Sequence, residues 1–243
     1  MGGSQMNRWK RVSVWLLAVL ILLTGCMRTD EFDQRIAEDL PREVQEVQVA
    51  VDQYRKEHNN VLPLKPPQGP TLYQKYILDF SKMSSYLPGT PSNSFQKGGH
   101  FVFVVVDPGA KKPQVRVLDL RVTEKLRELQ GRVDVYKERH GKLPKGPRQG
   151  EGIYDVDYEA LKMDRVTLPS PYHSELTLSP VLDSKGTVYV DYRKDVMMLL
   201  EESDQKPAKG QDLREILYRD SLFAPAHSLP MQWEKGDPVL KEE

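Results

Sequence analysis

Residues 44–63 read VQEVQVAVDQYRKEHNNVLP, and residues 126–144 read LRELQGRVDVYKERHGKLP. The two stretches share an ordered series of residues, with one gap before the last pair. The matches are Val51-Asp52 with Val133-Asp134, Tyr54 with Tyr136, His58 with His140, and Leu62-Pro63 with Leu143-Pro144. Further matches follow downstream in the same order. The distance along the chain between the two copies is too long for the repeat unit of a solenoid. The sequence therefore predicts two copies of one small module, over residues 42–121 and 122–204.

Apolar residues in both stretches recur at intervals of three and four, which is the spacing of one face of an α-helix. They are Val44, Val47, Val51 and Tyr54, continued by His58, and Leu126, Leu129, Val133 and Tyr136, continued by His140. Pro41 fits the first turn of the first helix, where a missing N–H costs nothing. Gly141 fits a left-handed cap at the end of the second helix, and Asn59 takes that place in the first.

Each predicted helix is followed by two apolar runs that a turn separates, which is typical of a β-hairpin. The runs are residues 101–106 with 115–120, and 176–182 with 188–192. The run 101–106 is apolar throughout, so we expect it to be covered on both faces. Ser184-Lys185-Gly186 predicts a turn with glycine at positive φ. The expected fold class is α+β, with two tandem helix–loop–β-hairpin modules and antiparallel sheet, the proline-rich segments 63–70 and 144–147 being connecting loops.

Shorter segments flank the two predicted modules. Residues 26–41 form a tether, which the spacing of Phe32, Ile36 and Leu40 predicts to be partly helical. Residues 205–243 begin with a polar link and a short helix that Asp212 caps. After this helix the chain contains Pro225, Pro230 and Pro238 and is expected to be an irregular tail.

Residues 1–25 have the organisation of an export signal. Arg8, Lys10 and Arg11 precede an apolar run of twelve residues, 12–23, which is too short to cross a bilayer core of roughly 30 Å. The run ends in Leu23-Thr24-Gly25-Cys26, and Cys26 is the only cysteine of the chain. This string resembles a bacterial lipobox, in which the cysteine thiol takes a diacylglycerol and becomes the mature N-terminus. A plain secretory peptide with a chance cysteine is the alternative.

The lipobox and the charged flank resemble those of the uncharacterised lipoproteins of Bacillus-type Firmicutes. The resemblance implies a protein held by lipid on the extracytoplasmic face of the cell membrane, and it implies no activity. The pattern Val-Asp-x-Tyr, followed by a turn and Leu-Pro, is also similar to the segment after the long helix of pseudopilins. That second likeness covers only short pieces of each module, and this chain has a lipobox where those proteins have a prepilin cleavage site.

Composition excludes several classes of protein. Residues 1–25 contain three basic and no acidic residues, so that the remaining chain, with 32 basic and 35 acidic residues, has a formal charge of −3. That balance argues against nucleic acid as a partner. Once Cys26 is lipidated no thiol remains, which excludes disulfides, thiolate catalysis and cysteine metal sites. We expect no cofactor and no metal, because no ligand spacing and no phosphate-binding loop is present.

His58 and His140, each four residues after a tyrosine, are the most conspicuous candidates for chemistry. The two histidines could share a metal, or either could act as a general base. Together with Tyr54 and Tyr136 they are also candidate binding residues. The structural alternative is that each histidine ends an apolar stripe at a helix C-terminus, half buried, where the helix dipole favours its protonated form. Ser170, Ser174 and Ser179 lie near His173 in sequence, but no Gly-x-Ser-x-Gly elbow supports a serine hydrolase.

The function expected from these features is that of a lipid-anchored, non-enzymatic envelope protein whose two modules bind a protein or cell-wall partner. Two alternatives stay open. One is a cell-wall hydrolase that uses His58 or His140, and the other is a pseudopilin-like subunit of an extracytoplasmic machine.

Overall fold

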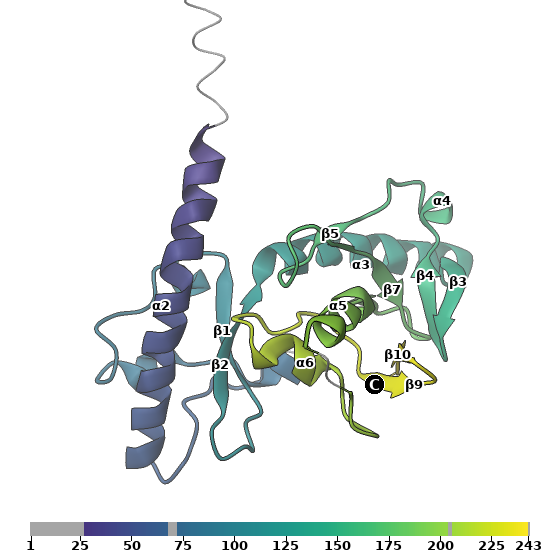
Figure 1. The fold of residues 1–243 in the computed structure, drawn as a ribbon. Coiled ribbons are helices and arrows are strands. Elements are labelled where there is room, and N and C mark those ends of the chain that lie inside the picture. The colour runs from purple at the N-terminus through teal and green to yellow at the C-terminus, as the bar shows by residue number, and fades with distance from the viewer. Residues whose placement is uncertain (1–26, 68–71, 204–205, 243) are drawn as a thin grey trace, which may run out of the picture. The chain divides into compact units, whose positions relative to one another are not determined.

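The computed structural model describes residues 27–67, 72–203 and 206–242 (Figure 1). The predicted signal peptide and Cys26 lie outside the described residues. The chain divides into two units, Met1–Glu43 and Val44–Glu243. The second unit mixes helices with small antiparallel sheets, so the α+β class is confirmed. No helix of the described residues is both long enough and apolar enough to cross a membrane.

Helix α2, Met27–Glu57, starts in the first unit and continues into the second. Residues 27–41 are therefore helical, and the prediction that the helix begins at Pro41 was wrong. Proline removes one N–H from the helix, and the apolar spacing that favours helix continues upstream of it. In the second unit Val44 is 5 % exposed, and Val47 and Val51 are fully buried, as the spacing predicts.

The first half of the second unit contains three short 3₁₀ turns and one hairpin. They are η1 Leu72–Lys75, η2 Phe80–Met83, η3 Phe95–Lys97, β1 Phe101–Val106 and β2 Gln114–Asp119. The expected hairpin is confirmed, and Val102 lies opposite Leu118 in its register. Two further segments extend the pairing through isolated bridges, Leu64 with Leu78 and Ile77 with Val104. Residues near 77 thus lie beside β1, and residues near 64 lie beside those in turn.

The hairpin is covered on both faces, as its apolar sequence predicts. Val104, Val106 and Leu118 belong to the large buried cluster that α3 also enters. Phe101, Phe103 and Val105 alternate with them and are also buried. The ring of Phe103 packs edge-on against Phe80 at 5.5 Å between centroids.

The second half of this unit starts with the long helix α3, Leu120–His140. Its shorter elements are β3 Lys145–Gly150, β4 Ile153–Val156, α4 Tyr158–Leu161, β5 Leu168–Pro169, β6 Thr177–Leu178, β7 Pro180–Leu182 and β8 Val188–Val190. The sheet order is β3-β4-β7-β8, and β5 pairs only with β6. The prediction of a loop at 144–147 was wrong, because residues from Lys145 pair with β4. The predicted strand 176–182 is divided at Ser179 between two sheets.

The C-terminal part consists of α5 Arg193–Ser203, α6 Arg214–Arg219, β9 Met231–Glu234 and β10 Asp237–Leu240. The short helix α6 is confirmed, and Asp212 accepts a hydrogen bond from the Arg214 N–H at 3.1 Å. The tail is not irregular, because Lys235 and Gly236 take positive φ and join β9 to β10 in a two-residue hairpin. Leu213, Leu217 and Met231 are buried in the same cluster as α3. Helix α5 was missing from the prediction.

Candidate functional site

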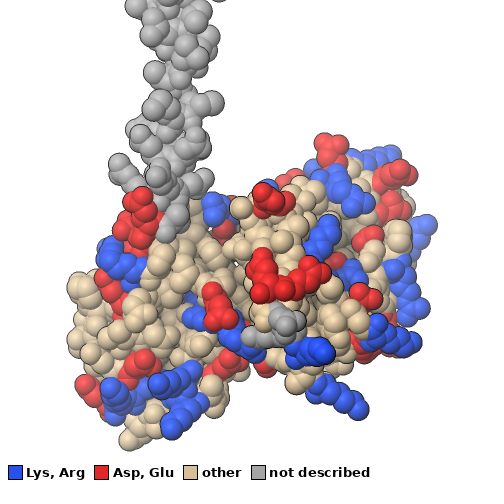
Figure 2. All heavy atoms as spheres, viewed as in Figure 1, with Lys and Arg blue, Asp and Glu red and all other residues tan. Residues whose placement is uncertain are grey.

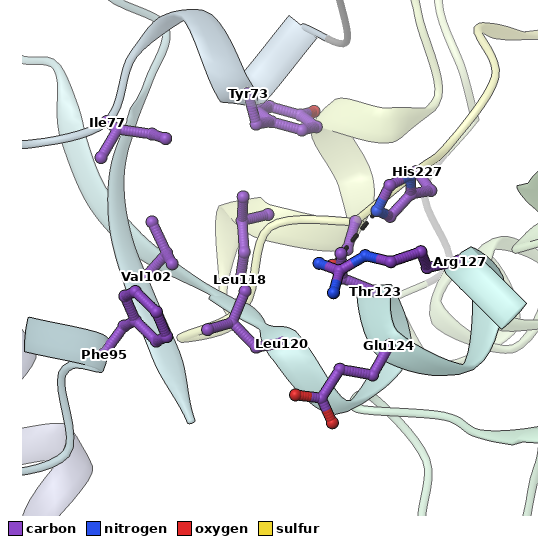
Figure 3. Close-up of a pocket in the computed structure, with 11 residues that line it drawn as sticks. Tyr73, Ile77, Phe95, Val102, Leu118, Leu120, Thr123, Glu124, Arg127 and His227 are labelled. Carbon is purple, nitrogen blue, oxygen red and sulfur yellow. Dashed lines mark hydrogen bonds between the residues drawn. The ribbon is translucent and has the colours of Figure 1, made fainter. Parts of the chain in front are cut away.

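A pocket of about 360 Å³ lies at the corner where β2 runs into α3 (Figure 3). Asp119 ends β2 and caps the helix, its carboxylate accepting a hydrogen bond from the Arg121 N–H at 2.9 Å. Leu120 is therefore the first helical residue, and no loop separates the strand from the helix. The pocket is lined by residues of the hairpin, of the first turns of α3 and of the loop that contains His227.

The hairpin side of the pocket is apolar. Ile77, Val102 and Leu118 contribute the wall, and Leu120 continues it onto the helix (Figure 3). The Phe95 ring also lines the pocket and is 62 % exposed, which is unusual for a phenylalanine in a folded protein. An exposed aromatic ring beside a concave apolar wall is typical of a binding site.

The helix side of the pocket is polar. Thr123 and Arg127 lie on one face of α3, and the Thr123 hydroxyl shares a hydrogen bond of 3.1 Å with Nε2 of His227. Burial lowers the pKa of His227 below its ordinary 6.5, and the positive charge of Arg127 lowers it further. The imidazole is therefore neutral at pH 7.

Two more groups define the electrostatics of the pocket. In Figure 3 the Arg127 guanidinium reaches toward Leu118, whereas the Glu124 carboxylate points away from it. The Arg127 side chain has no hydrogen bond and no ion pair among the described residues. Tyr73 lines the pocket, is only 5 % exposed, and its hydroxyl is without a hydrogen-bond partner in the described part of the chain. Burial raises the Tyr73 pKa, which keeps the hydroxyl protonated.

A pair of glutamines, which the sequence analysis missed, attaches each long helix to the hairpin that follows it. Gln48 on α2 accepts a hydrogen bond from the Val115 N–H at 2.7 Å and donates one to the Pro113 carbonyl at 3.1 Å. Gln130 on α3 makes the same pair of contacts. It accepts from the Val188 N–H at 2.8 Å and donates to the Gly186 carbonyl at 2.9 Å. The sequence contained a signal for this contact, because Gln48 and Gln130 align when residues 44–63 are matched with residues 126–144.

Other contacts recur at matching positions of the two halves. The Arg55 guanidinium donates to the Lys111 carbonyl at 3.5 Å, and Lys137 Nζ donates to the Lys185 carbonyl at 3.0 Å. These two cations align in the quoted stretches, and both carbonyls lie in hairpin turns. In the same way, the Asp79 N–H donates to the Pro63 carbonyl at 2.8 Å, and the Asp157 N–H to the Pro144 carbonyl at 2.9 Å. Both aspartates cap the short helical turn that follows.

The two candidate histidines occupy equivalent places at helix C-termini and are not among the residues that line the pocket. His58 Nδ1 donates to the Tyr54 carbonyl at 2.8 Å, and the rings stack with centroids 3.8 Å apart. His140 Nδ1 donates to the Tyr136 carbonyl at 3.0 Å, and those rings stack at 4.1 Å. Both imidazoles are exposed rather than half buried as expected. Gly141 and Asn59 follow them with positive φ, as predicted.

Ser170 and His173 come together around a third residue, Asp195 of α5. The carboxylate oxygen Oδ1 of Asp195 accepts the Ser170 hydroxyl at 2.6 Å and His173 Nδ1 at 3.0 Å. Ser170 Oγ also accepts the N–H groups of Tyr172 and His173, at 2.9 and 3.1 Å. Both lone pairs of this oxygen are therefore used, and its proton goes to a carboxylate rather than to a histidine. The arrangement fixes the loop before β6 to α5 and does not activate a nucleophile.

Part of the chain is similar to a known protein family. Residues 41–119 match the model of the YphF family N-terminal domain, which covers about a third of the chain. No significant match was found among curated proteins or among solved structures. The matched segment ends at Asp119, the last residue of β2, which is the corner at which the pocket lies.

Within residues 27–67, 72–203 and 206–242, no group of three or more His, Cys, Asp or Glu side chains is placed to hold a metal ion. On the face seen in Figure 2, acidic and basic side chains are interspersed rather than divided into two fields.

Proposed function

We propose that the protein is a lipid-anchored lipoprotein of the extracytoplasmic face of the cell membrane, with diacylglycerol on Cys26, and that it binds a partner rather than catalysing a reaction. The lipobox-like string Leu23-Thr24-Gly25-Cys26 supports the anchor. The observation that carries the binding role is the pocket at the corner of β2 and α3, with the exposed Phe95 ring in its lining. We propose a protein or cell-wall component as partner.

We further propose that residues 42–121 and 122–204 are two copies of one helix–hairpin module. Gln48 and Gln130 support this, because each makes the same two hydrogen bonds to the following hairpin. The segment that matches the family model, residues 41–119, nearly coincides with the first proposed module. The pocket then lies where the first module meets the helix of the second.

The hydrolase alternative receives no comparable support. The ring nitrogen Nδ1 of each candidate histidine is bound to a carbonyl of its own helix, and the Ser170 oxygen is saturated by hydrogen bonds. No structural observation favours a pseudopilin-like subunit. The binding role therefore stands as the proposal.

Substitution of Cys26 tests the anchor. We expect the Cys26→Ala chain to stay in precursor form, to incorporate no alkyne-tagged palmitate and to leave the membrane fraction. The matched control is Met27→Ala, one residue further on, which keeps the lipobox and should be labelled like the natural chain. Normal labelling and membrane retention of Cys26→Ala would refute the lipoprotein.

A photo-crosslinking residue at position 95 tests the binding role in intact envelopes. We expect a discrete adduct from position 95 and none from position 135, where the native valine is exposed on α3 at a distance along the helix from the pocket residues. Equal adducts from the two positions, or none from position 95, would count against the pocket as the binding site.

A further inference from the structure

We propose that the pocket at the corner of β2 and α3 binds a small carboxylate with an apolar body, the carboxylate lying against Arg127 and the body against the hairpin wall. This inference rests on the binding role proposed above and gives the chemistry of the group on the protein or cell-wall partner that enters the pocket, and it is independent of the lipid anchor. It rests on the geometry of four side chains and on the size of the cavity.

The polar groups that face the pocket are suited to an acceptor. Arg127, an exposed residue that lines the pocket, contributes a guanidinium without a bonding partner among the described residues. The one acid of the lining, Glu124, directs its carboxylate away from the Arg127 guanidinium (Figure 3). A hydrogen bond from a guanidinium to a carboxylate oxygen is charge-assisted and about twice as strong as one between neutral groups, so Arg127 favours an anionic ligand.

The charge of the pocket favours a carboxylate over a phosphate. Arg127 is the only cation in its lining, because burial keeps His227 neutral at pH 7. A carboxylate carries one negative charge, which Arg127 balances. A phosphate monoester carries about 1.5 to 2 charges at pH 7, part of which would stay uncompensated.

The remaining lining selects an apolar body of limited size. Ile77, Val102 and Leu118 form a continuous apolar wall, and Phe95 supplies an exposed ring. A volume of about 360 Å³ lies at the lower end of the range for small-molecule sites. A short aliphatic or phenylalkyl group fits that description better than a long lipid chain.

Calorimetric titration of the purified full chain with 4-phenylbutyrate and its neutral amide tests the proposal. We expect the acid to bind about tenfold more tightly than the amide, because a hydrogen bond to a charged group discriminates by about that factor. In Arg127→Met the two affinities should become equal through loss of acid binding alone. The control Arg132→Met removes an exposed arginine of α3 outside the pocket lining and should keep the preference.

Two further measurements, one with a Phe95 variant and one with a phosphate ligand, complete the test. Phe95→Ser, at an exposed position, should weaken the acid and the amide by the same factor without changing the helix content. A phenylpropyl phosphate should bind more weakly than the acid, and tighter binding would overturn the carboxylate. No saturable binding of the acid, or an acid preference that survives Arg127→Met, would overturn the proposal. If crosslinks from position 95 still form in that case, only the ligand class is wrong, and if they do not, the binding role fails as well.

Discussion

Gln130 is the counterpart of Gln48: each side chain bridges an N–H and a carbonyl of the hairpin that follows its helix, with four hydrogen bonds of 2.7 to 3.1 Å in all. Each amide uses its oxygen and its nitrogen at once. Both glutamines are half buried, beside the fully buried Val47 and Leu129. The contact fixes the distance between helix and hairpin in both halves of the second unit.

Replacing either glutamine with leucine should therefore destabilise the fold. Gln130→Leu leaves the Val188 N–H and the Gly186 carbonyl without their partner, at an expected loss of about 1–3 kcal/mol in the free energy of unfolding. Gln48→Leu should cost a similar amount. The control is Gln53→Leu, an exposed position on α2. Urea denaturation measures all three, and losses no larger than that of the control would show that the amide contacts contribute nothing.

Two glycines of α3 should respond to alanine with opposite signs. Gly131 lies inside the helix, with no atom within 4 Å of an added Cβ, so Gly131→Ala should raise stability by about 0.5–1 kcal/mol. Gly141 caps the helix at φ 65°, where a side chain is strained, so Gly141→Ala should lower stability by about 1–2 kcal/mol. Thermal unfolding of both variants checks the prediction. A gain in stability from Gly141→Ala would contradict the left-handed cap, and a loss from Gly131→Ala would contradict the open space beside that residue.

Asp195 should make the protein more stable in mild acid. Burial raises the pKa of this carboxyl above its ordinary 3.8, although hydrogen bonds from Ser170 and His173 oppose the rise. The folded state then takes up a proton before the unfolded state does, so this group adds stability as the pH falls through the raised value toward 3.8. Asp195→Asn should lack that gain. Urea midpoints from pH 7 to 4 test it against Asp164→Asn, an exposed control, and a pH-independent difference from the natural chain would refute it.

His227 should make the protein less stable in mild acid, in contrast to Asp195. Burial and the charge of Arg127 lower its pKa below 6.5, so the unfolded state binds the proton first and stability falls as the pH drops below 6.5. His227→Gln should remove that part of the decline, and Arg127→Met should reduce it. The exposed His58→Gln serves as control. The prediction fails if His227→Gln and the natural chain lose stability in parallel between pH 7 and 5.

The spacing of apolar residues was enough to predict the long helices and the first hairpin strand, together with the faces that they bury. The spacing of Val44, Val47 and Val51 predicted a helix with that face inside, and the uninterrupted run 101–106 predicted a strand covered on both sides. Positive φ at Asn59 and Gly141 followed from residue type alone. These predictions succeed because they depend on neighbours within a few residues along the chain.

The errors have local causes as well. Pro41 was taken as a start, although a helix can continue past one missing N–H. Pro238 suggested an irregular tail, although it lies in a two-stranded hairpin whose turn, Lys235-Gly236, is a recognisable signal. The prolines outweighed the turn signal in the prediction.

The candidate site could not be predicted, because its residues are remote in sequence. Tyr73, Thr123 and His227 belong to a 3₁₀ turn, a helix and a C-terminal loop, and only the tertiary fold brings them to one cavity. The histidines that stood out in the sequence, His58 and His140, stack on their own helices instead. Only the aligned glutamines could have been recognised in advance.

The direct junction between Asp119 and Leu120 restricts where the chain can accept an inserted residue. One inserted residue would rotate everything after it by about 100° around the helix axis, since an α-helix has 3.6 residues per turn. Arg127 would turn away from Val102 and Leu118, which precede the junction, whereas Gln130 and Val188 both follow it and would keep their contact. Insertions should be tolerated in the exposed turns of the hairpins. At the junction of β2 and α3 they should not be, because it fixes the rotation of the helix relative to the hairpin.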